Sequence, residues 1–312
     1  SDVGNIKAVA SSIIHSYIQL LANFLPESLD TRNILFDING GAAGICIETI
    51  AEYFHLNYTL QSPMPREFWR EIEPRQEYIA PIAQKFTQTT DFAACFDCDA
   101  DRVEFVLKNG RVLSGQVVLA LVLRYLLAKK MQQQIIVNDA TSGMVREVVQ
   151  AFGGELIEVE VGEANVVENM DRFETLYGGE GSSGGAIIGP NRCRDGILST
   201  FLIAAFIQET GTSLETLVQE LPEYFTIRRQ IRGIDYQILR EKFTHYSKKQ
   251  GWKITQTGDH TGGLKAWIRD DLWFWIRGSK TETNLVRLIG DGKDEQEVQR
   301  YLDVIETELC GV

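Results

Sequence analysis

The sequence contains little cysteine and little histidine. Its 312 residues include five cysteines and four histidines. An odd cysteine count in a long chain argues against a disulfide framework and fits a reducing compartment, so we expect a cytoplasmic protein. The Cys95-x-x-Cys98 pair has no second pair to complete a zinc site, and it does not open a helix as a redox motif would. The histidines are scattered and fit no metal-ligand spacing.

Long apolar runs and an excess of basic charge are also missing. No apolar segment approaches the roughly 18 residues of a membrane span, and residues 1–7 lack the basic and apolar regions of a signal peptide. The formal net charge is −12, with a pI near 4.9, and no basic stripe alternates with aromatics. We therefore expect neither nucleic acid nor a membrane as a partner. The composition, 44% hydrophobic and 24% charged, is that of a globular chain.

The most informative stretch is acidic. Asp97, Asp99 and Asp101 alternate with other residues between two apolar runs, residues 92–96 and residues 103–107. This pattern predicts a strand, a tight loop and a second strand. Alternate residues of an extended loop point to the same side, and three carboxylates that converge repel one another unless a cation lies among them. Hard cations prefer oxygen ligands, so the stretch predicts a Mg²⁺ site.

Three other interpretations of this stretch are compatible with an acidic loop between two strands or resemble one. A solvated acidic turn is possible because aspartate is common in turns. A calcium loop of the EF-hand type is excluded, because its glycine and glutamate positions hold Arg102 and Lys108 here. A phosphatase of the haloacid dehalogenase type would use Asp97 as nucleophile and Asp99 as acid/base. That interpretation stays open from these residues alone, although its downstream Ser/Thr and Lys motifs are not recognisable.

Strand and helix patterns alternate along the first two thirds of the chain. A buried strand is predicted at residues 33–38, followed by a glycine turn at residues 40–44 and an apolar helix, which is the order of an α/β unit. A second α/β series includes a helix at residues 116–129 and a strand at residues 134–137. The glycine turn is not G-x-G-x-x-G, and tight strand-to-helix packing explains it as well as phosphate binding does.

A second candidate binding loop is rich in glycine. Residues 178–185 contain one carboxylate, Glu180, and two hydroxyls, Ser182 and Ser183. Glycine lets a backbone approach a ligand closely, and a carboxylate with hydroxyls and amides suits a polyol such as a sugar. The alternative is a mobile hairpin loop. Residues 195–196, Asp-Gly, are predicted to begin the next helix.

The C-terminal part follows a break at Pro222 and has the pattern of an α+β module with strands on both sides of a helix. One of its turns combines charge-assisted and hydroxyl donors that suit a phosphate. These donors are Arg277, Ser279, Lys280 and Thr281. A charged hairpin tip is the alternative interpretation.

Taken together, four motifs resemble those of the α-D-phosphohexomutase family, which comprises phosphoglucomutase, phosphomannomutase and phosphoglucosamine mutase. They occur in the family's order over essentially the whole chain. They are a metal loop similar to D-G-D-x-D-R at residues 97–102, a sugar loop similar to G-G-E-x-S-G at residues 178–184, a D-G-I at residues 195–197 and a phosphate clamp similar to R-x-S-x-T-E-P at residues 277–283.

The resemblance implies an α/β fold: two related three-layer α/β domains followed by a smaller α+β domain. The metal-loop domain would comprise residues 1–112, the sugar-loop domain residues 113–223 and the phosphate-clamp domain residues 224–312. These would correspond to the second, third and fourth domains of the family.

The resemblance also implies a chemistry. The family interconverts hexose 1-phosphates and 6-phosphates through hexose 1,6-bisphosphate, so a hexose phosphate is the expected partner. Mg²⁺ on Asp97, Asp99 and Asp101 would activate an enzyme phosphoserine, and Arg102 would stabilise charge near the transferring group. The substrate-binding residues would be Glu180, Ser182, Ser183, Arg277, Ser279, Lys280 and Thr281.

Departures from the family pattern are as informative as the matches. The phosphoserine loop, similar to T-x-S-H-N-P, does not occur in the 312 residues, so we expect an N-terminal domain encoded upstream and no activity from this chain alone. Val159 and Ala164 replace a threonine and a basic residue of a T-x-V-G-D-K/R motif, and Thr283 replaces proline in the clamp. A non-catalytic phosphosugar-binding or regulatory homologue is therefore the alternative function, and the sugar stays open.

Overall fold

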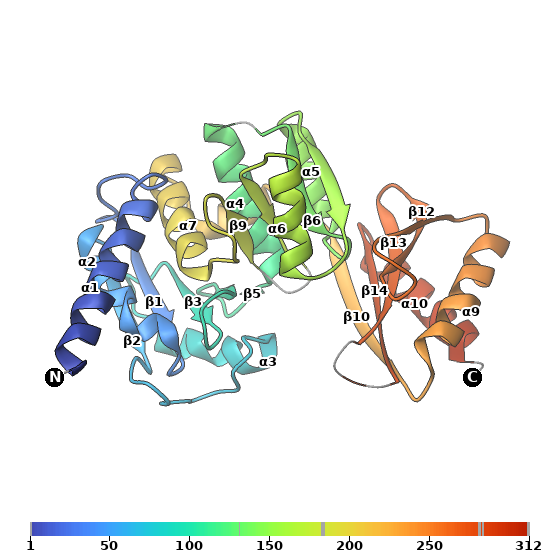
Figure 1. Ribbon diagram of the computed structural model, residues 1–312, viewed down its shortest axis with the longest axis horizontal. Coiled ribbons are helices and arrows are strands. Elements are labelled where there is room, and N and C mark those ends of the chain that lie inside the picture. Colours follow the sequence, from blue (N-terminus) through green and yellow to red (C-terminus); the bar gives the residue numbers. More distant parts are fainter. Residues whose placement is uncertain (1, 131, 182–184, 280–281, 283, 311–312) are drawn as a thin grey trace. The chain divides into compact units, whose positions relative to one another are not determined.

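The computed structural model describes all residues except 1, 131, 182–184, 280–281, 283 and 311–312. Figure 1 shows the helices and strands of the chain. The chain divides into two compact units. The first unit consists of Ser1–Lys129 and Ser183–Glu220, and the second of Lys130–Ser182 and Leu221–Val312. Within the described part of the chain, no helix combines the length and hydrophobicity that crossing a bilayer requires.

The first unit is built on a mixed five-stranded sheet with strand order β2-β1-β3-β4-β5. β1 pairs in parallel with β2 and β3, whereas β4 is antiparallel to both β3 and β5. All five residues of β3 are buried, as expected for a central strand covered on both faces. The strands are β1 (Asn33–Asp37), β2 (Asn57–Gln61), β3 (Phe92–Phe96), β4 (Val103–Val106) and β5 (Val112–Leu113).

Helices cover both faces of this sheet. On one face, Leu35 and Ala93 pack with Ile79 and Ile82 of α3 and η2. On the other, Phe36 stacks on Phe201 of α7, with the ring centroids 6.0 Å apart. The remaining elements are α1 (Asp2–Leu21), η1 (Ala42–Ile45), α2 (Ile47–Tyr53), α3 (Gln76–Ile79), η2 (Ala80–Lys85), α4 (Gly115–Lys129), β9 (Ala186–Ile188), α7 (Gly196–Thr210) and α8 (Leu214–Gln219).

The second unit begins with a small parallel sheet. β6 pairs in parallel with β7 on one side and with β8 on the other. Each connection between these strands contains a helix, which is the usual crossover between parallel neighbours. The carboxyl ends of the three strands therefore lie at one edge. The elements are β6 (Gln134–Asn138), α5 (Gly143–Ala151), β7 (Glu155–Val159), α6 (Glu163–Arg172) and β8 (Tyr177–Gly179).

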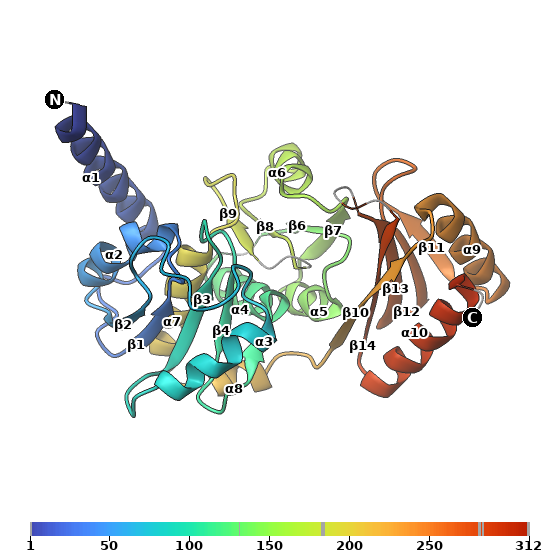
Figure 2. The same ribbon diagram turned by 90° about the horizontal axis from the view of Figure 1, so that it is seen from below.

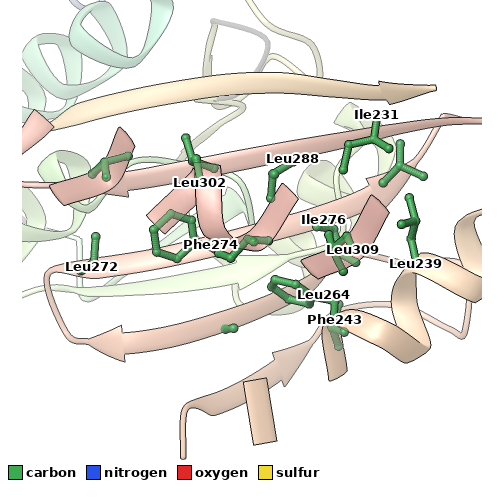
Figure 3. Close-up of a cluster of buried hydrophobic side chains, with 14 residues drawn as sticks. Ile231, Leu239, Phe243, Leu264, Leu272, Phe274, Ile276, Leu288, Leu302 and Leu309 are labelled. Atoms are coloured by element: carbon green, nitrogen blue, oxygen red, sulfur yellow. The ribbon is translucent and has the colours of Figure 1, made fainter. Parts of the chain in front are cut away.

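An antiparallel sheet of order β10-β14-β13-β12-β11 forms the rest of the second unit. Both of its helices, α9 and α10, lie on the same face (Figure 2). There Phe274 and Leu288 pack with Leu302 of α10 and Phe243 of α9 in a buried cluster (Figure 3). The elements are β10 (Phe225–Arg232), α9 (Tyr236–Lys249), β11 (Lys253–Gln256), β12 (Leu264–Arg269), β13 (Leu272–Gly278), β14 (Leu285–Gly292) and α10 (Glu295–Cys310).

Residues on the opposite face of this sheet are buried as well. Trp273 and Trp275 alternate with Phe274 along β13 and form a second cluster with Ala140, which follows β6. Because side chains of a strand point alternately to the two faces, β13 is apolar on both. The predicted α/β class, with an antiparallel α+β module at the C-terminal end, is confirmed.

Candidate functional site

The acidic loop connects β3 to β4 and brings three carboxylates together. Asp97, Asp99 and Asp101 each offer one oxygen, and these oxygens all lie within 4.8 Å of one another. Ala100 has a φ of 61°, a left-handed conformation that turns the chain between the last two carboxylates. Asp101 Oδ1 is buried and has no hydrogen-bond partner among the described residues. An all-oxygen donor set with such an unsatisfied atom fits a hard cation such as Mg²⁺.

Two arginines contact these carboxylates. Arg102 Nε lies 2.5 Å from Asp97 Oδ2 and 3.5 Å from Asp101 Oδ1. Arg194, from the segment before α7, forms an ion pair with Asp101. Burial raises the pKa of Asp101 to about 6, and Asp97 adds to the increase, although the Arg194 guanidinium opposes it. The loop thus carries three carboxylates against two guanidinium groups, which leaves it negative enough to attract a cation.

Close backbone packing fixes the shape of the acidic loop. The Gly196 amide, at the start of α7, donates to Ala100 O at 3.1 Å, and a Cβ at this glycine would lie 2.8 Å from the same oxygen. On another side, the Ala42 amide donates to Cys98 O at 2.7 Å. The glycine turn and the Asp-Gly motif of the sequence therefore both pack against the acidic loop.

A buried ion pair supports the strand that leads into the loop. Arg70 Nε lies 2.6 Å from Asp37 Oδ2, and the two side chains are only 2% and 0% exposed. The Arg70 guanidinium also donates to Phe96 O at 2.6 Å, immediately before Asp97. Trp69 Nε1 donates to the second Asp37 oxygen at 2.7 Å. Sequence reasoning missed Arg70 and Arg194, because neither lies in a recognisable motif near the residue that it contacts.

The sugar-loop carboxylate lies in the second unit, just after β8. Glu180 is 4% exposed, and its Oε1 accepts from the Gly162 amide at 2.7 Å and from Asn138 Nδ2 at 3.2 Å. Ser182 and Ser183, the hydroxyls predicted to act with it, lie outside the described residues.

The proposed phosphate clamp lies at the end of β13. Arg277 is 8% exposed, and its guanidinium lies 2.9 Å from Glu160 Oε1. Ser279 accepts at Oγ from the Glu282 amide at 3.1 Å. Lys280 and Thr281 lie outside the described residues.

The turn between β7 and α6 joins these two features. Its Glu160 pairs with Arg277, and its Gly162 amide binds Glu180. Sequence reasoning singled out this turn for the basic residue that it lacks. The structure instead shows that it supplies a carboxylate to the clamp arginine.

Comparisons with known proteins show which proteins the chain is similar to. Residues 114–225 match the family model described as phosphoglucomutase/phosphomannomutase, alpha/beta/alpha domain III. The phosphoglucomutase/phosphomannomutase of Thermococcus kodakarensis is 26% identical over 314 residues, which cover 97% of this chain and 66% of that protein. A probable phosphoglucosamine mutase of Methanopyrus kandleri is 30% identical over 237 residues, covering 75% of this chain and 51% of that protein.

Solved structures show the same fold. A phosphoglucomutase/phosphomannomutase family protein of Burkholderia thailandensis matches with a TM-score of 0.80 at 17% identity, over 95% of this chain and 64% of that one. The phosphoglucomutase pp63/parafusin of Paramecium, in an open form, matches with a TM-score of 0.77 at 18% identity, over 95% of this chain and 62% of that one. The chain spans at most about two thirds of these relatives. In sequence and in fold the chain is thus similar to members of the α-D-phosphohexomutase family, and residues 114–225 match that family's third domain directly.

Proposed function

We propose that this chain supplies the metal-, sugar- and phosphate-binding parts of a phosphohexomutase that interconverts hexose 1-phosphate and hexose 6-phosphate. The convergence of Asp97, Asp99 and Asp101 within 4.8 Å is the observation that carries the proposal, because the family match leaves phosphoryl transfer as the chemistry that needs such a site. The positions of Glu180 and Arg277 support the proposal, because the motifs that contain them follow the acidic loop in the order found in the family.

Each residue has a distinct part in this proposal. Mg²⁺ on the three aspartates would act as a Lewis acid that neutralises charge on a transferring phosphoryl group. Arg102 holds Asp97 by its Nε and adds positive charge beside the metal loop. Glu180 would accept from sugar hydroxyls, and Arg277 would bind the phosphate that does not react. Ser182, Ser183, Ser279, Lys280 and Thr281 complete the proposed substrate-binding set.

The proposed domain division is that of the family. It places the metal loop in residues 1–112, the sugar loop in residues 113–223 and the phosphate clamp in residues 224–312. The family match over residues 114–225 supports the middle domain. The break at Pro222 falls beside the boundary between the two parts of the chain at Glu220 and Leu221.

The ligands are proposed as a class. Relatives carry the names phosphoglucomutase/phosphomannomutase and phosphoglucosamine mutase, so glucose, mannose and glucosamine phosphates are all candidates. Structures of Aspergillus fumigatus N-acetylphosphoglucosamine mutase contain GlcNAc-6P with magnesium, or glucose 1,6-bisphosphate. We infer Mg²⁺ and hexose 1,6-bisphosphate for this chain on that basis. A cytoplasmic location is proposed from the small and odd number of cysteines alone.

Turnover is not proposed for the 312 residues by themselves. A phosphoryl shift needs a nucleophile that receives the group and returns it, and a serine is adequate only when activated. The sequence contains no T-x-S-H-N-P-like segment. The alternative, a phosphosugar-binding or regulatory homologue, is favoured by Val159, at the end of β7, and Ala164, at the start of α6, which stand where the family motif has a threonine and a basic residue.

Calorimetric titration of the chain with glucose, mannose and glucosamine 1-phosphates tests the binding proposal. Arg277→Ala should weaken the best ligand by about 1.5 kcal/mol or more, roughly tenfold, because a charged hydrogen bond is lost. Arg269→Ala is the matched control, since this arginine is exposed and pairs with Glu297 and Asp271. Equal affinity of the wild type and Arg277→Ala would contradict the assignment of the clamp.

A further inference from the structure

The edge where three parallel strands end carries a buried polar network. Asn138 is the last residue of β6, Gly162 follows β7 and Glu180 follows β8. β6 lies between the other two strands, and all three run in parallel. In α/β sheets, ligands bind beyond the carboxyl ends of the strands. The network therefore lies where the fold favours a binding site.

The two neighbouring strand ends each donate a hydrogen bond to Glu180. Its Oε1 accepts from the Gly162 amide at 2.7 Å and from Asn138 Nδ2 at 3.2 Å. Glu180 is 4% exposed and Asn138 is fully buried. A buried carboxylate is costly unless donors replace its water, so these two donors fix where the carboxylate can lie.

Thr141 orients the donor amide. Its Oγ1 donates to Asn138 Oδ1 at 2.9 Å, so the other end of the amide, Nδ2, is directed at Glu180. The same Oγ1 accepts from the Gly181 amide at 3.3 Å. Thr141 thus holds the carboxylate through Asn138, and holds the loop immediately after Glu180 through its backbone. Thr141 is itself fully buried.

We propose that Asn138 and Thr141 are positioning residues that set the orientation of Glu180 toward the hydroxyls of a hexose phosphate. Neither residue touches the sugar in this arrangement; both act through Glu180 and the backbone of its loop. The inference rests on the proposed function, because it assumes that Glu180 binds the sugar. It adds two residues that lie outside every motif recognised in the sequence.

Thr141 offers a matched pair of variants. Thr141→Val keeps the side-chain shape and removes the hydroxyl, whereas Thr141→Ser keeps the hydroxyl. Calorimetry of the 312-residue chain should show hexose 1-phosphate binding weakened about tenfold in Thr141→Val, because a buried acceptor and a buried amide lose their partner. Thr141→Ser should stay within about twofold of the wild type.

Inorganic phosphate separates positioning from a general loss of structure. Its affinity depends on the Arg277 clamp and involves no sugar, so it should be unchanged in both Thr141 variants. Weakening of both ligands to the same extent would mean a structural role only. If Thr141→Val does not fold, Asn138→Asp replaces the donor with a second carboxylate, and it should weaken the hexose phosphate selectively.

Two outcomes distinguish failure of this inference from failure of the proposed function. If the wild-type chain binds hexose 1-phosphate and Thr141→Val binds it equally well, the positioning role is wrong and the function stands. If the wild type binds hexose 1-phosphate no more tightly than inorganic phosphate, then Glu180 is not a sugar ligand. In that case the proposed function and the positioning role both fail.

Discussion

The acidic loop of the first unit and the Glu180–Arg277 region of the second unit neutralise their charges in opposite ways. Around the acidic loop, three carboxylates meet two guanidinium groups, and Asp101 Oδ1 is left without a hydrogen bond among the described residues. Among the described residues around the turn after β7, Glu180 accepts from the Gly162 amide and from Asn138 Nδ2, and Arg277 pairs with Glu160. Arg277 Nε is buried and has no hydrogen-bond partner in the described ranges.

This difference indicates which kind of ligand each region can bind. The first has an unsatisfied acceptor and excess negative charge, so we expect a cation to bind there. The second has an unsatisfied donor on a buried arginine, so we expect an anion or a neutral acceptor to bind there. A magnesium ion and a phosphate are such ligands.

Two ion pairs, Asp37–Arg70 in the first unit and Glu158–Lys265 in the second, should differ in how much stability they contribute. Asp37→Ala leaves Arg70 buried without its partner, so it should lower the free energy of unfolding by about 3–5 kcal/mol. Lys265→Met, in the second unit, should cost less, because Glu158 keeps its ion pair with Arg146. Urea denaturation of both variants checks this. Equal decreases in the free energy of unfolding would show that the Asp37–Arg70 pair contributes no more stability than the Lys265–Glu158 pair.

Magnesium binding should depend on the first region alone. Asp99→Asn removes the most exposed of the three carboxylates, so it should abolish most of the heat of Mg²⁺ binding without affecting folding. Asp270→Asn, at an exposed aspartate elsewhere, is the control. If the wild type and Asp99→Asn give the same negligible heat, the metal site is absent. Binding is expected to be weak in this chain, because the family's phosphoserine would contribute a further ligand.

Anion binding in the second region should improve when its internal carboxylate is removed. Glu160 contributes the 2.9 Å ion pair to Arg277, so a bound phosphate competes with it. Glu160→Gln should tighten inorganic phosphate binding about threefold to tenfold, or roughly 0.7–1.4 kcal/mol. Titration by calorimetry measures it. Weaker binding in this variant would mean that Glu160 orients Arg277 and does not compete with the ligand.

A smaller effect concerns pH. Burial raises the pKa of Asp139, although the hydrogen bonds from Thr257 and Trp275 oppose the increase. A carboxyl with a raised folded pKa contributes stability that is complete below its unfolded pKa of about 3.9 and is lost as pH rises through the folded value. Asp139→Asn should therefore lose less stability than the wild type between about pH 4 and pH 7.

Unfolding free energies of the two proteins at several pH values in this window test that sign. Asp270→Asn again serves as the control and should follow the wild type. If Asp139→Asn loses more unfolding free energy than the wild type as the pH rises, the pKa of Asp139 is not raised by folding.

Local patterns in the sequence predicted the first region better than the second. The strand at residues 92–96 and the acidic loop were found because apolar and acidic residues are contiguous there, and β3 has the predicted bounds. Arg194 was missed because it lies 93 residues from Asp101. Asn138 was missed for a similar reason, being 42 residues from Glu180. Periodicity and motif spacing carry no information about such distant partners.

Short or exposed strands were also missed. β2 has only exposed and half-buried residues, so it lacks the apolar run that marks a buried strand. β8 is three residues long and contains two glycines. Its residues were therefore interpreted as part of a glycine-rich loop. The C-terminal module, in contrast, was predicted as strands on both sides of a helix, and β10 and β11 do flank α9 along the chain.

The central claim is that this chain binds a hexose phosphate without converting it. A ³¹P NMR spectrum of hexose 1-phosphate with the chain, Mg²⁺ and a trace of hexose 1,6-bisphosphate tests binding and turnover together. We predict that the 1-phosphate resonance shifts or broadens as the chain is added, and that no 6-phosphate resonance appears. An unperturbed 1-phosphate resonance, or a growing 6-phosphate resonance, would contradict the account.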